Sequence, residues 1–387
     1  MRIAQVAPLA ESVPPHLYGG TERVIAWLID ELVDLGHEVT LFASGDSSSR
    51  AKLVPAWPRS LRLARPRSDP IVAQTALLAE VTQRVHDFDL IHCHVDWLHL
   101  PLLTQQRVPF LSTLHGRLDL PGLPRLIEHF PNAPFVSISD NQREPLAKAN
   151  WLGTVYHGLP AQSLRPSLDP GRYLAFLGRI SPEKGPEAAI NIAQASGLPL
   201  RIAAKIPRGE QRYFAGRIEP KVDGDRIQIV GEVNDEAKQN FLGMAAALLF
   251  PIDWPEPFGL VMIEAMACGT PVIAFGRGSV PEIVEDGVTG FIVEDEAAAV
   301  EAVGRLSQLD RREIRRQFER RFTAARMARD YVGLYEMLVT KFRASDVRTV
   351  AAPMHHAARD ESLVLSKPDA SGIDRAGVKP VRNPGEN

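Results

Sequence analysis

The chain has 387 residues, 45% of them hydrophobic and 24% charged, which are the proportions of a globular protein and exclude disordered and fibrous classes. Lys and Arg number 44 against 47 Asp and Glu, and this near balance argues against a nucleic-acid binder, which usually carries a basic excess. Cys93 and Cys268 are too few for a disulfide framework, so we expect both in the core of a cytoplasmic protein. Residues 1–8 are too short and interrupted for a signal peptide, and no apolar run approaches the ~20 residues of a membrane span.

In chain order, the first part alternates short apolar runs with helical periodicity. We predict strands at residues 2–7, 38–43, 90–94, 110–115 and 135–139, and a helix at 21–35 whose apolar stripe holds Val24, Leu28 and Leu32. The strand runs are almost continuously apolar, as in strands covered on both faces. Strands alternating with helices predict crossover connections and a parallel sheet.

The same alternation starts again at Tyr173. We predict strands at 173–178, 200–204, 227–230, 247–250 and 271–275, with helices at 186–196, 235–244 and 260–268. These elements predict two similar α/β domains, residues 1–165 and 166–324, joined through a proline-containing segment. Residues 325–342 have the apolar periodicity of one further helix, and residues 343–387, which lack Phe, Trp and Tyr, are predicted to form a disordered tail.

Residues 256–272 carry the strongest chemical signal. Glu256 precedes a predicted helix, and the N–H groups of Gly259 and Leu260, with the helix dipole, form a candidate anion site. Glu264 lies about 6–7 Å further along the helix axis, a separation that suits a diphosphate and the paired hydroxyls of a ribose. The alternative is a buried helix in which Glu264 is a paired core carboxylate.

Two further loops have the same character. Arg179 and Lys184 follow a predicted strand, at the edge of the sheet where open α/β proteins bind ligands. A planar guanidinium and an ammonium together suit a diphosphate, the alternative being two solvated cations. In the first domain, the motif Tyr18-Gly19-Gly20 occupies the first strand-to-helix turn and permits close approach to a ligand, or merely forms a tight turn.

Together these motifs resemble the retaining glycosyltransferases of family 4. The resemblance extends over about residues 1–342 and includes residues 89–94, 113–116 and 322–335 besides the loops above. It implies an α/β protein of the GT-B fold, with two Rossmann-like parallel-sheet domains facing across a cleft and a C-terminal helix that returns to the first domain. It also implies transfer of a hexosyl group from a nucleotide-diphosphate sugar, UDP-glucose being our first choice, to an acceptor hydroxyl, without a metal ion or cofactor.

The resemblance also implies roles for single residues. The expected donor-binding residues are Gly19, Gly20, Arg179, Lys184, Glu256, Phe258, Gly259, Leu260 and Glu264. Four residues are expected to act in catalysis: His115, which matches the histidine facing the reacting sugar, and Arg179, Lys184 and Glu256. The two cations would stabilise the charge that builds on the leaving diphosphate. His157 is a departure, since relatives often carry Asn there.

Two other functions are compatible with parts of this pattern. His92, His94 and Asp96 alternate at a strand end, and side chains alternating in this way share one face and could hold a metal ion. A metal-dependent hydrolase is therefore one alternative, although a packing role or an acceptor-side role for these residues fits the resemblance better. The second is a non-hydrolysing nucleotide-sugar epimerase, which shares the fold and needs no acceptor.

Two basic stretches remain outside these motifs. One surrounds Trp57 in a segment that we predict to be a loop, and it would contact anionic headgroups at the inner membrane face or an acidic acceptor, or be solvated: Arg50, Lys52, Arg59, Arg62, Arg65 and Arg67. The other is a predicted helix at residues 310–329, whose arginines we expect to form local pairs on a solvated face. We predict no nucleic-acid partner, and the sequence does not indicate an oligomeric state.

Overall fold

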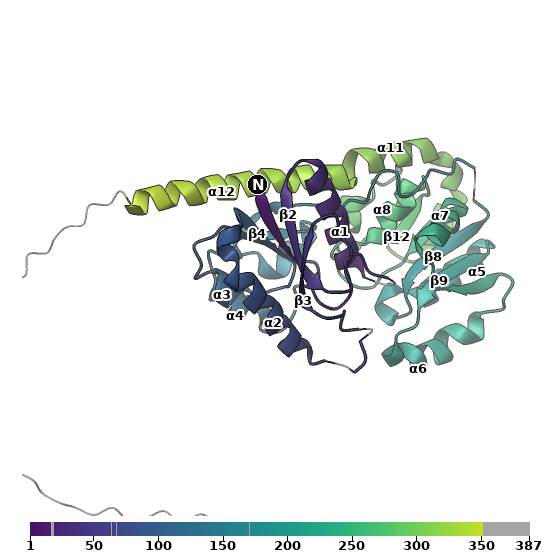
Figure 1. The fold of residues 1–387 in the computed structure, drawn as a ribbon. Coiled ribbons are helices and arrows are strands. Elements are labelled where there is room, and N and C mark those ends of the chain that lie inside the picture. Colours follow the sequence, from purple (N-terminus) through teal and green to yellow (C-terminus); the bar gives the residue numbers. More distant parts are fainter. Residues whose placement is uncertain (17–18, 63, 67, 170, 351–387) are drawn as a thin grey trace, which may run out of the picture. The chain divides into compact units, whose positions relative to one another are not determined.

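The structure is a computed structural model that describes residues 1–16, 19–62, 64–66, 68–169 and 171–350, with the side chains of 235 and 345–350 left out. Tyr18, Arg67 and the predicted tail beyond residue 350 lie outside the described residues. Within that part the chain forms two parallel sheets, each with helices around it (Figure 1). The predicted α/β architecture is therefore confirmed.

The first sheet has seven parallel strands in the order β3-β2-β1-β4-β5-β6-β7. Its strands are β1 (Arg2–Val6), β2 (Glu38–Ser44), β3 (Lys52–Trp57), β4 (Leu90–Cys93), β5 (Phe110–Thr113), β6 (Phe135–Ser137) and β7 (Trp151–Thr154). Around them lie α1 (Gly20–Asp34), α2 (Pro70–Gln83), α3 (Leu100–Leu103), α4 (Leu123–Glu128) and two 3₁₀ turns, η1 (Val85–Asp87) and η2 (Asn141–Leu146). We call this sheet and its helices the first half.

The second half is built around a six-stranded parallel sheet of order β10-β9-β8-β11-β12-β13. Its strands are β8 (Tyr173–Arg179), β9 (Leu200–Lys205), β10 (Ile227–Gly231), β11 (Ala245–Phe250), β12 (Val272–Phe275) and β13 (Gly290–Val293). Its α-helices are α5 (Pro186–Ser196), α6 (Gln211–Tyr213), α7 (Asp235–Gly243), α8 (Leu260–Ala267), α9 (Val280–Ile283), α10 (Glu296–Gly304) and α11 (Arg311–Arg321). In both sheets the strand order reverses beside the first strand, which is where ligands bind in folds of this kind.

The central strands are buried on both faces, and this explains their short apolar runs. Along β1, Ile3 packs into one core cluster with residues of α1, whereas Ala4 and Val6 pack into another with residues of α2. Successive side chains of a strand point to opposite faces, so a strand between two layers of helices needs apolar residues at every position.

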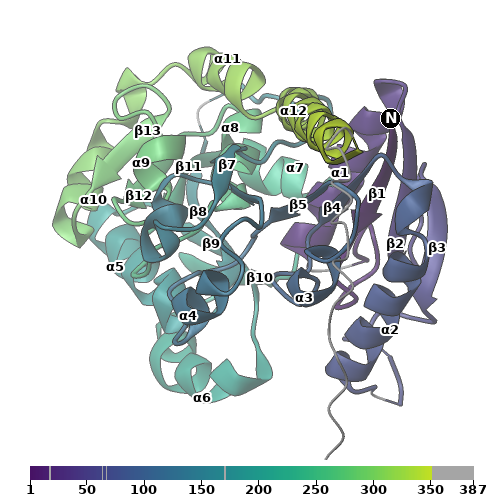
Figure 2. The same ribbon diagram turned by 90° about the vertical axis from the view of Figure 1, so that its left-hand side faces the viewer.

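The helix α12 (Ala324–Val350) returns from the second half to the first. Met327, Tyr331 and Tyr335 are buried in the core cluster that also holds Val24 and Leu28 of α1. Figure 2 shows α12 nearly end-on beside α1. The predicted returning helix is thus confirmed, and it continues to Val350 rather than ending at residue 342.

Polar contacts under α12 accompany this apolar packing. The hydroxyl of Tyr335 lies 2.7 Å from Nδ1 of His92, and Nε2 of the same ring lies 2.7 Å from Oγ1 of Thr113. That threonine oxygen is 3.0 Å from the hydroxyl of Tyr331. All four residues are buried, so each of these polar groups needs the partner that it has.

The basic stretch around Trp57 differs from its prediction. Residues 52–57 are not a loop but β3, an edge strand paired with β2. Pro55 is compatible with this place, because an edge strand leaves some of its N–H groups unpaired. Such a strand is polar and half-buried, so it lacks the apolar run by which the other strands were predicted.

The arginine-rich stretch at 310–329 also differs. It is broken at Phe322 and Thr323 into α11 and α12, with Phe322 fully buried. Arg311, expected on a solvated face, is 9% exposed and donates hydrogen bonds to the carbonyls of Ser167, Gly243 and Ala245. The expected local ion pairs are present between the exposed Arg316 and Arg320 and Glu313, and also between the half-buried Arg315 and Glu319.

Both cysteines are buried and unbonded, as expected. No helix in the described part of the chain is both long and apolar enough to cross a bilayer.

Replacing Tyr335 by Phe should lower the free energy of unfolding by about 1–3 kcal/mol, because it leaves the buried Nδ1 of His92 without a partner. Urea unfolding measures the change. Met337, on the same helix, is 45% exposed, and Met337→Ala should stay within about 0.5 kcal/mol of wild type. A Tyr335→Phe variant as stable as wild type would contradict this account of the helix.

Candidate functional site

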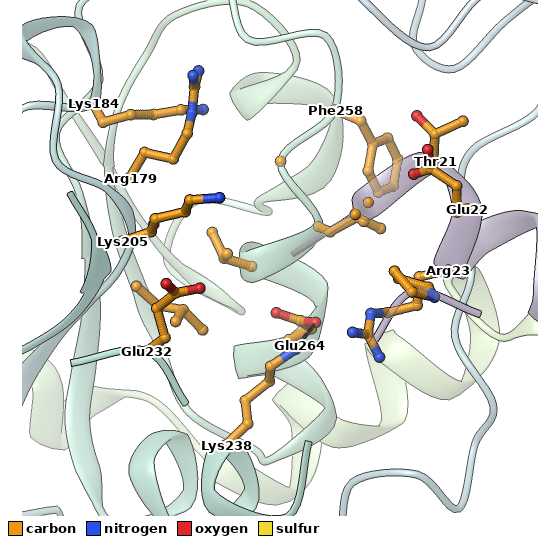
Figure 3. Close-up of a pocket in the computed structure, with 18 of the residues that line it drawn as sticks. Thr21, Glu22, Arg23, Arg179, Lys184, Lys205, Glu232, Lys238, Phe258 and Glu264 are labelled. Carbon is orange, nitrogen blue, oxygen red and sulfur yellow. Dashed lines mark hydrogen bonds and ion pairs between the residues drawn. The ribbon is translucent and has the colours of Figure 1, made fainter. Parts of the chain in front are cut away.

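A cavity of about 740 Å³ lies between the two halves. Its walls come from the first turn of α1 and the end of β5 in the first half, and from the ends of β8 and β9 and the start of α8 in the second. Every residue predicted to bind a donor or to act in catalysis lines it: Gly19, Gly20, His115, Arg179, Lys184, Glu256, Phe258, Gly259, Leu260 and Glu264. Figure 3 shows the labelled side chains of this cavity, with Arg179, Lys184 and Lys205 on one side and Thr21, Glu22 and Arg23 on the other.

Two loops of the second half pack against each other at one wall. Lys184, after β8, forms an ion pair with Glu256, and its Nζ lies 4.7 Å from the ring centroid of Trp254. Gly185 has φ +69°, and a Cβ there would lie 1.9 Å from the carbonyl oxygen of Pro251. Charge, cation–π and backbone contacts therefore join the two loops, which requires glycine at 185.

Residues 256–259, which precede α8, are fixed by a glycine at one end and by hydrogen bonds from Ser279. Gly259, with φ +78°, stands immediately before the helix, where a Cβ would lie 2.7 Å from Cε of Met262. Ser279 donates its backbone N–H to the carbonyl of Glu256 at 2.9 Å and its hydroxyl to that of Phe258 at 2.9 Å. The first N–H groups of α8 therefore stand at the cavity in a fixed place, where they and the helix dipole favour an anion.

Glu264 combines the two roles that the sequence left open. It is 5% exposed and forms an ion pair of 2.6 Å with Lys238 of α7, and it also lines the cavity. Figure 3 shows the Lys238 side chain reaching the Glu264 carboxylate. The pair bonds one carboxylate oxygen, Oε1.

The first turn of α1 closes the cavity from the other side. A Cβ on Gly20 would lie 3.4 Å from Cδ1 of Leu260, so the two halves come close together here. A Cβ on Gly19 would lie 2.8 Å from Cβ of Pro15, which leaves no room for a side chain. Beside them, burial raises the pKa of the Glu22 carboxyl, so a proton is retained there more easily than in water.

His115 stands after β5 with a second histidine against it. Its Nε2 lies 2.8 Å from Nδ1 of His94, and its ring stacks on His157 with centroids 5.3 Å apart. His157, which was noted only as a departure from the resemblance, also contacts Phe258 at 4.8 Å between ring centroids. Burial lowers the pKa of His115 to about 3, so the ring is neutral near pH 7.

The three candidate metal ligands do not form a ligand set in the described part of the chain, although the ring centroids of His92 and His94 lie 4.0 Å apart. His92 is bonded at both ring nitrogens to Tyr335 and Thr113, and His94 is bonded to Gln5 and His115. β4 ends at Cys93, so exposed Asp96 lies beyond the strand, at φ 51°, and does not continue its alternation. Among the described residues no three His, Cys, Asp or Glu form a metal-binding group. None of the three residues lines the cavity, and His94 instead lies directly behind His115.

The sequence analysis missed several cavity residues. They are Arg23, Arg62, Lys205, Glu232, Asn234 and Lys238. Lys205 ends β9, the same position that identified Arg179 on β8, so the strand-end rule could have found it. Burial and the charge of Arg62 lower the pKa of Lys205. Arg62, assigned to the basic stretch, is ion-paired with Glu11 of this cavity.

Two family models match the chain and together span most of it. Residues 18–175 match the model described as "Glycosyltransferase Family 4", and residues 165–323 match "Glycosyl transferases group 1". Curated relatives match most of the chain. The chain is 26% identical over 342 residues to a D-inositol 3-phosphate glycosyltransferase of Kribbella flavida, covering 71% of this chain and 78% of that protein. It is 27% identical over 328 residues to a phosphatidyl-myo-inositol mannosyltransferase of Mycolicibacterium smegmatis, covering 76% and 81%.

Solved structures show the same arrangement of the chain. AviGT4, described as a glycosyltransferase involved in avilamycin A biosynthesis, is similar with a TM-score of 0.66 and 26% identity, covering 88% of this chain and 98% of that one. Sucrose-phosphate synthase from Thermosynechococcus elongatus has a TM-score of 0.72 at 20% identity, covering 88% and 99%. HepE from Anabaena, in complex with UDP and glucose, has a TM-score of 0.67 at 20% identity, covering 87% and 100%. At these identities the last two likenesses show the fold alone.

The buried histidines predict a loss of stability in mild acid. Among the described residues, five buried histidines have a pKa lowered by burial: His92, His94, His99, His115 and His157. Below a pH of about 6.5, the ordinary pKa of histidine, these rings bind protons in the unfolded chain but not in the folded chain. The free energy of unfolding should therefore fall as the pH drops from 6.5, by up to about 1.4 kcal/mol per pH unit for each histidine.

Urea unfolding between pH 7.5 and pH 5 measures this slope. His99→Gln should make this slope shallower by up to about 1.4 kcal/mol per pH unit, the contribution of one bound proton. The reason is that burial lowers the pKa of the His99 ring to about 3. The exposed His86 is a matched control, and His86→Gln should leave the slope as in wild type. A wild-type stability that does not change between these pH values would overturn the prediction.

Proposed function

This chain belongs to family 4 of the glycosyltransferases, the retaining enzymes of the GT-B fold, and on that basis we propose that it transfers a hexosyl group from a nucleotide-diphosphate sugar to an acceptor hydroxyl without a metal ion. The observation that carries the proposal is the set of charges around one cavity. Arg179 and Lys184 stand on one wall, and Glu256 and Glu264 stand on either side of the α8 N-terminus. This arrangement suits a diphosphate held between cations and sugar rings held by carboxylates.

In the proposed complex the donor lies along the start of α8. Its diphosphate is bound by Arg179, Lys184 and the N–H groups of Gly259 and Leu260. Its ribose hydroxyls donate to Glu264, whose Oε1 is also bonded to Lys238. The transferred sugar lies toward Glu256, which is supported by its contacts with Ser279 and Lys184.

The chemistry in this arrangement is a substitution at the anomeric carbon on one face of the sugar. The bond from that carbon to the diphosphate oxygen breaks, the acceptor oxygen forms the new bond, and the acceptor proton passes to the leaving phosphate. Negative charge builds on the diphosphate, and Arg179 and Lys184 stabilise it without having to reorganise. These two cations take the part that a divalent ion plays in other transferases.

His115 faces this centre from the first half. Its ring is neutral and fixed by His94 and His157, so it offers a hydrogen-bonding surface rather than a charge to the sugar. We propose that residues 1–165 and 166–324 are two domains that close on the donor, bringing Gly20 and His115 to it. The acceptor then enters from the side of the first domain.

UDP-glucose is the first donor to test. HepE, a structural neighbour, has been solved in complex with UDP-glucose, although that likeness supports the fold and not the donor. For the acceptor, the curated relatives named for D-inositol 3-phosphate and phosphatidyl-myo-inositol make a phosphorylated inositol the first compound to test.

The two alternative functions lose their support. Family membership favours transfer over epimerisation. The metal-dependent hydrolase needed His92, His94 and Asp96 as a ligand set, but the ring nitrogens of both histidines are bonded to other side chains and Asp96 lies beyond the end of the strand. A chelator should accordingly leave the rate of transfer unchanged, whereas the hydrolase would lose its activity.

A thermal-shift screen against UDP-, GDP-, ADP- and dTDP-sugars tests the donor site. A sugar nucleotide that binds the folded protein must raise its melting temperature, by an amount that grows with concentration. We expect one nucleotide series to do so, and the same donor to release nucleotide diphosphate only when an acceptor is present. Release that does not depend on an acceptor would indicate hydrolysis or another reaction.

Lys184→Ala and Glu264→Ala should each reduce turnover while the protein stays folded. For Lys184→Ala we expect a loss of about 100- to 1,000-fold, the size found when one group that stabilises developing negative charge is removed. Lys148 is exposed in the first half and gives a matched control, so Lys148→Ala should keep the wild-type rate. Circular dichroism and melting curves verify folding, and wild-type turnover in either site variant would reject the assignment.

A further inference from the structure

The loop that carries His115 is held by one buried glutamine. Gln142 is 5% exposed, and its Nε2 donates to the carbonyls of Leu114 at 2.9 Å and Gly116 at 2.8 Å. Its Oε1 accepts the backbone N–H of Ile138 at 2.9 Å. Carbonyls only accept and a backbone N–H only donates, so a single orientation of the amide satisfies all three bonds. The residues on both sides of His115 are therefore positioned by this side chain.

Gln142 belongs to the turn η2, and the start of that turn is bound by the second half. Both oxygens of the Glu282 carboxylate are used: Oε2 accepts the N–H of Asp140 at 2.7 Å, and Oε1 accepts the N–H of Asn141 at 2.8 Å. The hydroxyl of Tyr156 donates to Oε2 at 3.1 Å. A carboxylate that accepts two adjacent backbone N–H groups forms strong, charge-assisted bonds and fixes the direction of the turn.

Glu282 is itself tied to the donor side of the cavity. It lies on α9, whose preceding residue Ser279 donates to the carbonyls of Glu256 and Phe258. Arg321 of α11 donates to the backbone carbonyl of Glu282 and so helps to fix the position of this residue. One short helix of the second half therefore contacts the segment around Glu256 and also the turn that places His115.

We propose that Glu282 is a positioning residue for the transfer reaction, which binds η2 to the second half and through Gln142 sets the place of His115 opposite the donor. This inference rests on the proposed function of the cavity. Glu282 does not line the cavity, and its carboxylate contacts the backbone N–H groups of Asp140 and Asn141 and the hydroxyl of Tyr156. Its effect falls on the alignment of the reacting groups, where a displacement of about 1 Å costs about 100-fold in rate.

The test compares Glu282→Gln with wild type in steady-state kinetics. The amide keeps the size of the carboxylate but turns an NH₂ group toward one of the two backbone N–H groups. The start of η2 therefore loses one of the two hydrogen bonds that bind it to the second half. We expect kcat to fall about 10- to 100-fold, while the KM for the donor and the donor-induced rise in melting temperature stay within about twofold of wild type. Glu301, exposed on α10, is the matched control, and Glu301→Gln should keep both constants.

A second variant tests the same path from its other end. Gln142→Glu keeps the acceptor for Ile138 but loses the donor to Leu114 and Gly116, so it should lower kcat with the donor KM unchanged. The double variant should lose little more than the more damaged single one, because the two side chains act as one unit. The Gln142→Glu result decides the matter if Glu282→Gln fails to fold.

Several outcomes would overturn the proposal. The first is a wild-type kcat in either variant. The second is a change confined to the KM for the donor, which would place Glu282 in donor binding. The third is a double variant in which the two losses of kcat multiply. A wild-type protein that transfers no sugar from any donor overturns the proposed function itself, and this inference with it. Transfer by wild type together with full activity in both variants rejects the positioning role alone.

Discussion

The ion pair between Lys184 and Glu256 is the contact on which the cavity depends. Each charge, 15% and 11% exposed in the side chain, would be costly to hold there alone, and each offsets the cost of the other. The pair joins the loop after β8 to the loop before α8. Arg179 and the N-terminus of α8 therefore line the same cavity. A parallel sheet makes such a meeting possible because all its strands end at the same edge.

The first half contributes a group of neutral rings to the cavity, beside the charged side chains of Glu22, Arg23 and Arg62. His94, His115 and His157 are stacked or hydrogen-bonded to one another, and burial keeps them unprotonated. Behind them, α12 covers the first sheet with Tyr331 and Tyr335, so the last helix of the chain supports the strands that lead to the cavity. Neutral rings opposite Arg179 and Lys184 suit a reaction in which negative charge develops only on the leaving diphosphate.

The predictions found the strands that are buried on both faces, but in the two described sheets they missed the edge strands β3, β7 and β13 and found only the edge strand β10. The central strands β1, β4 and β5 have apolar residues at nearly every position, and the sequence shows them directly. The edge strand β3 is half-buried, and β7 and β13 lie at the far edges of their sheets, so they lack that pattern. Arg311 was misplaced for the related reason that a charged residue in an arginine-rich helix gives no sign that backbone carbonyls surround it.

The sequence alone determined the α/β class, the presence of a last helix and the loops whose residues line the cavity, because apolar periodicity and short loop motifs are local properties of the chain. The return of that helix to the first half was implied by the family resemblance. Only the tertiary structure decided which distant groups meet. Lys238 pairs with Glu264, and Glu282 binds the turn at Asp140, a residue 142 positions earlier in the chain. Such contacts depend on how two sheets and their helices pack, and the spacing of residues along one sequence holds no measure of that packing.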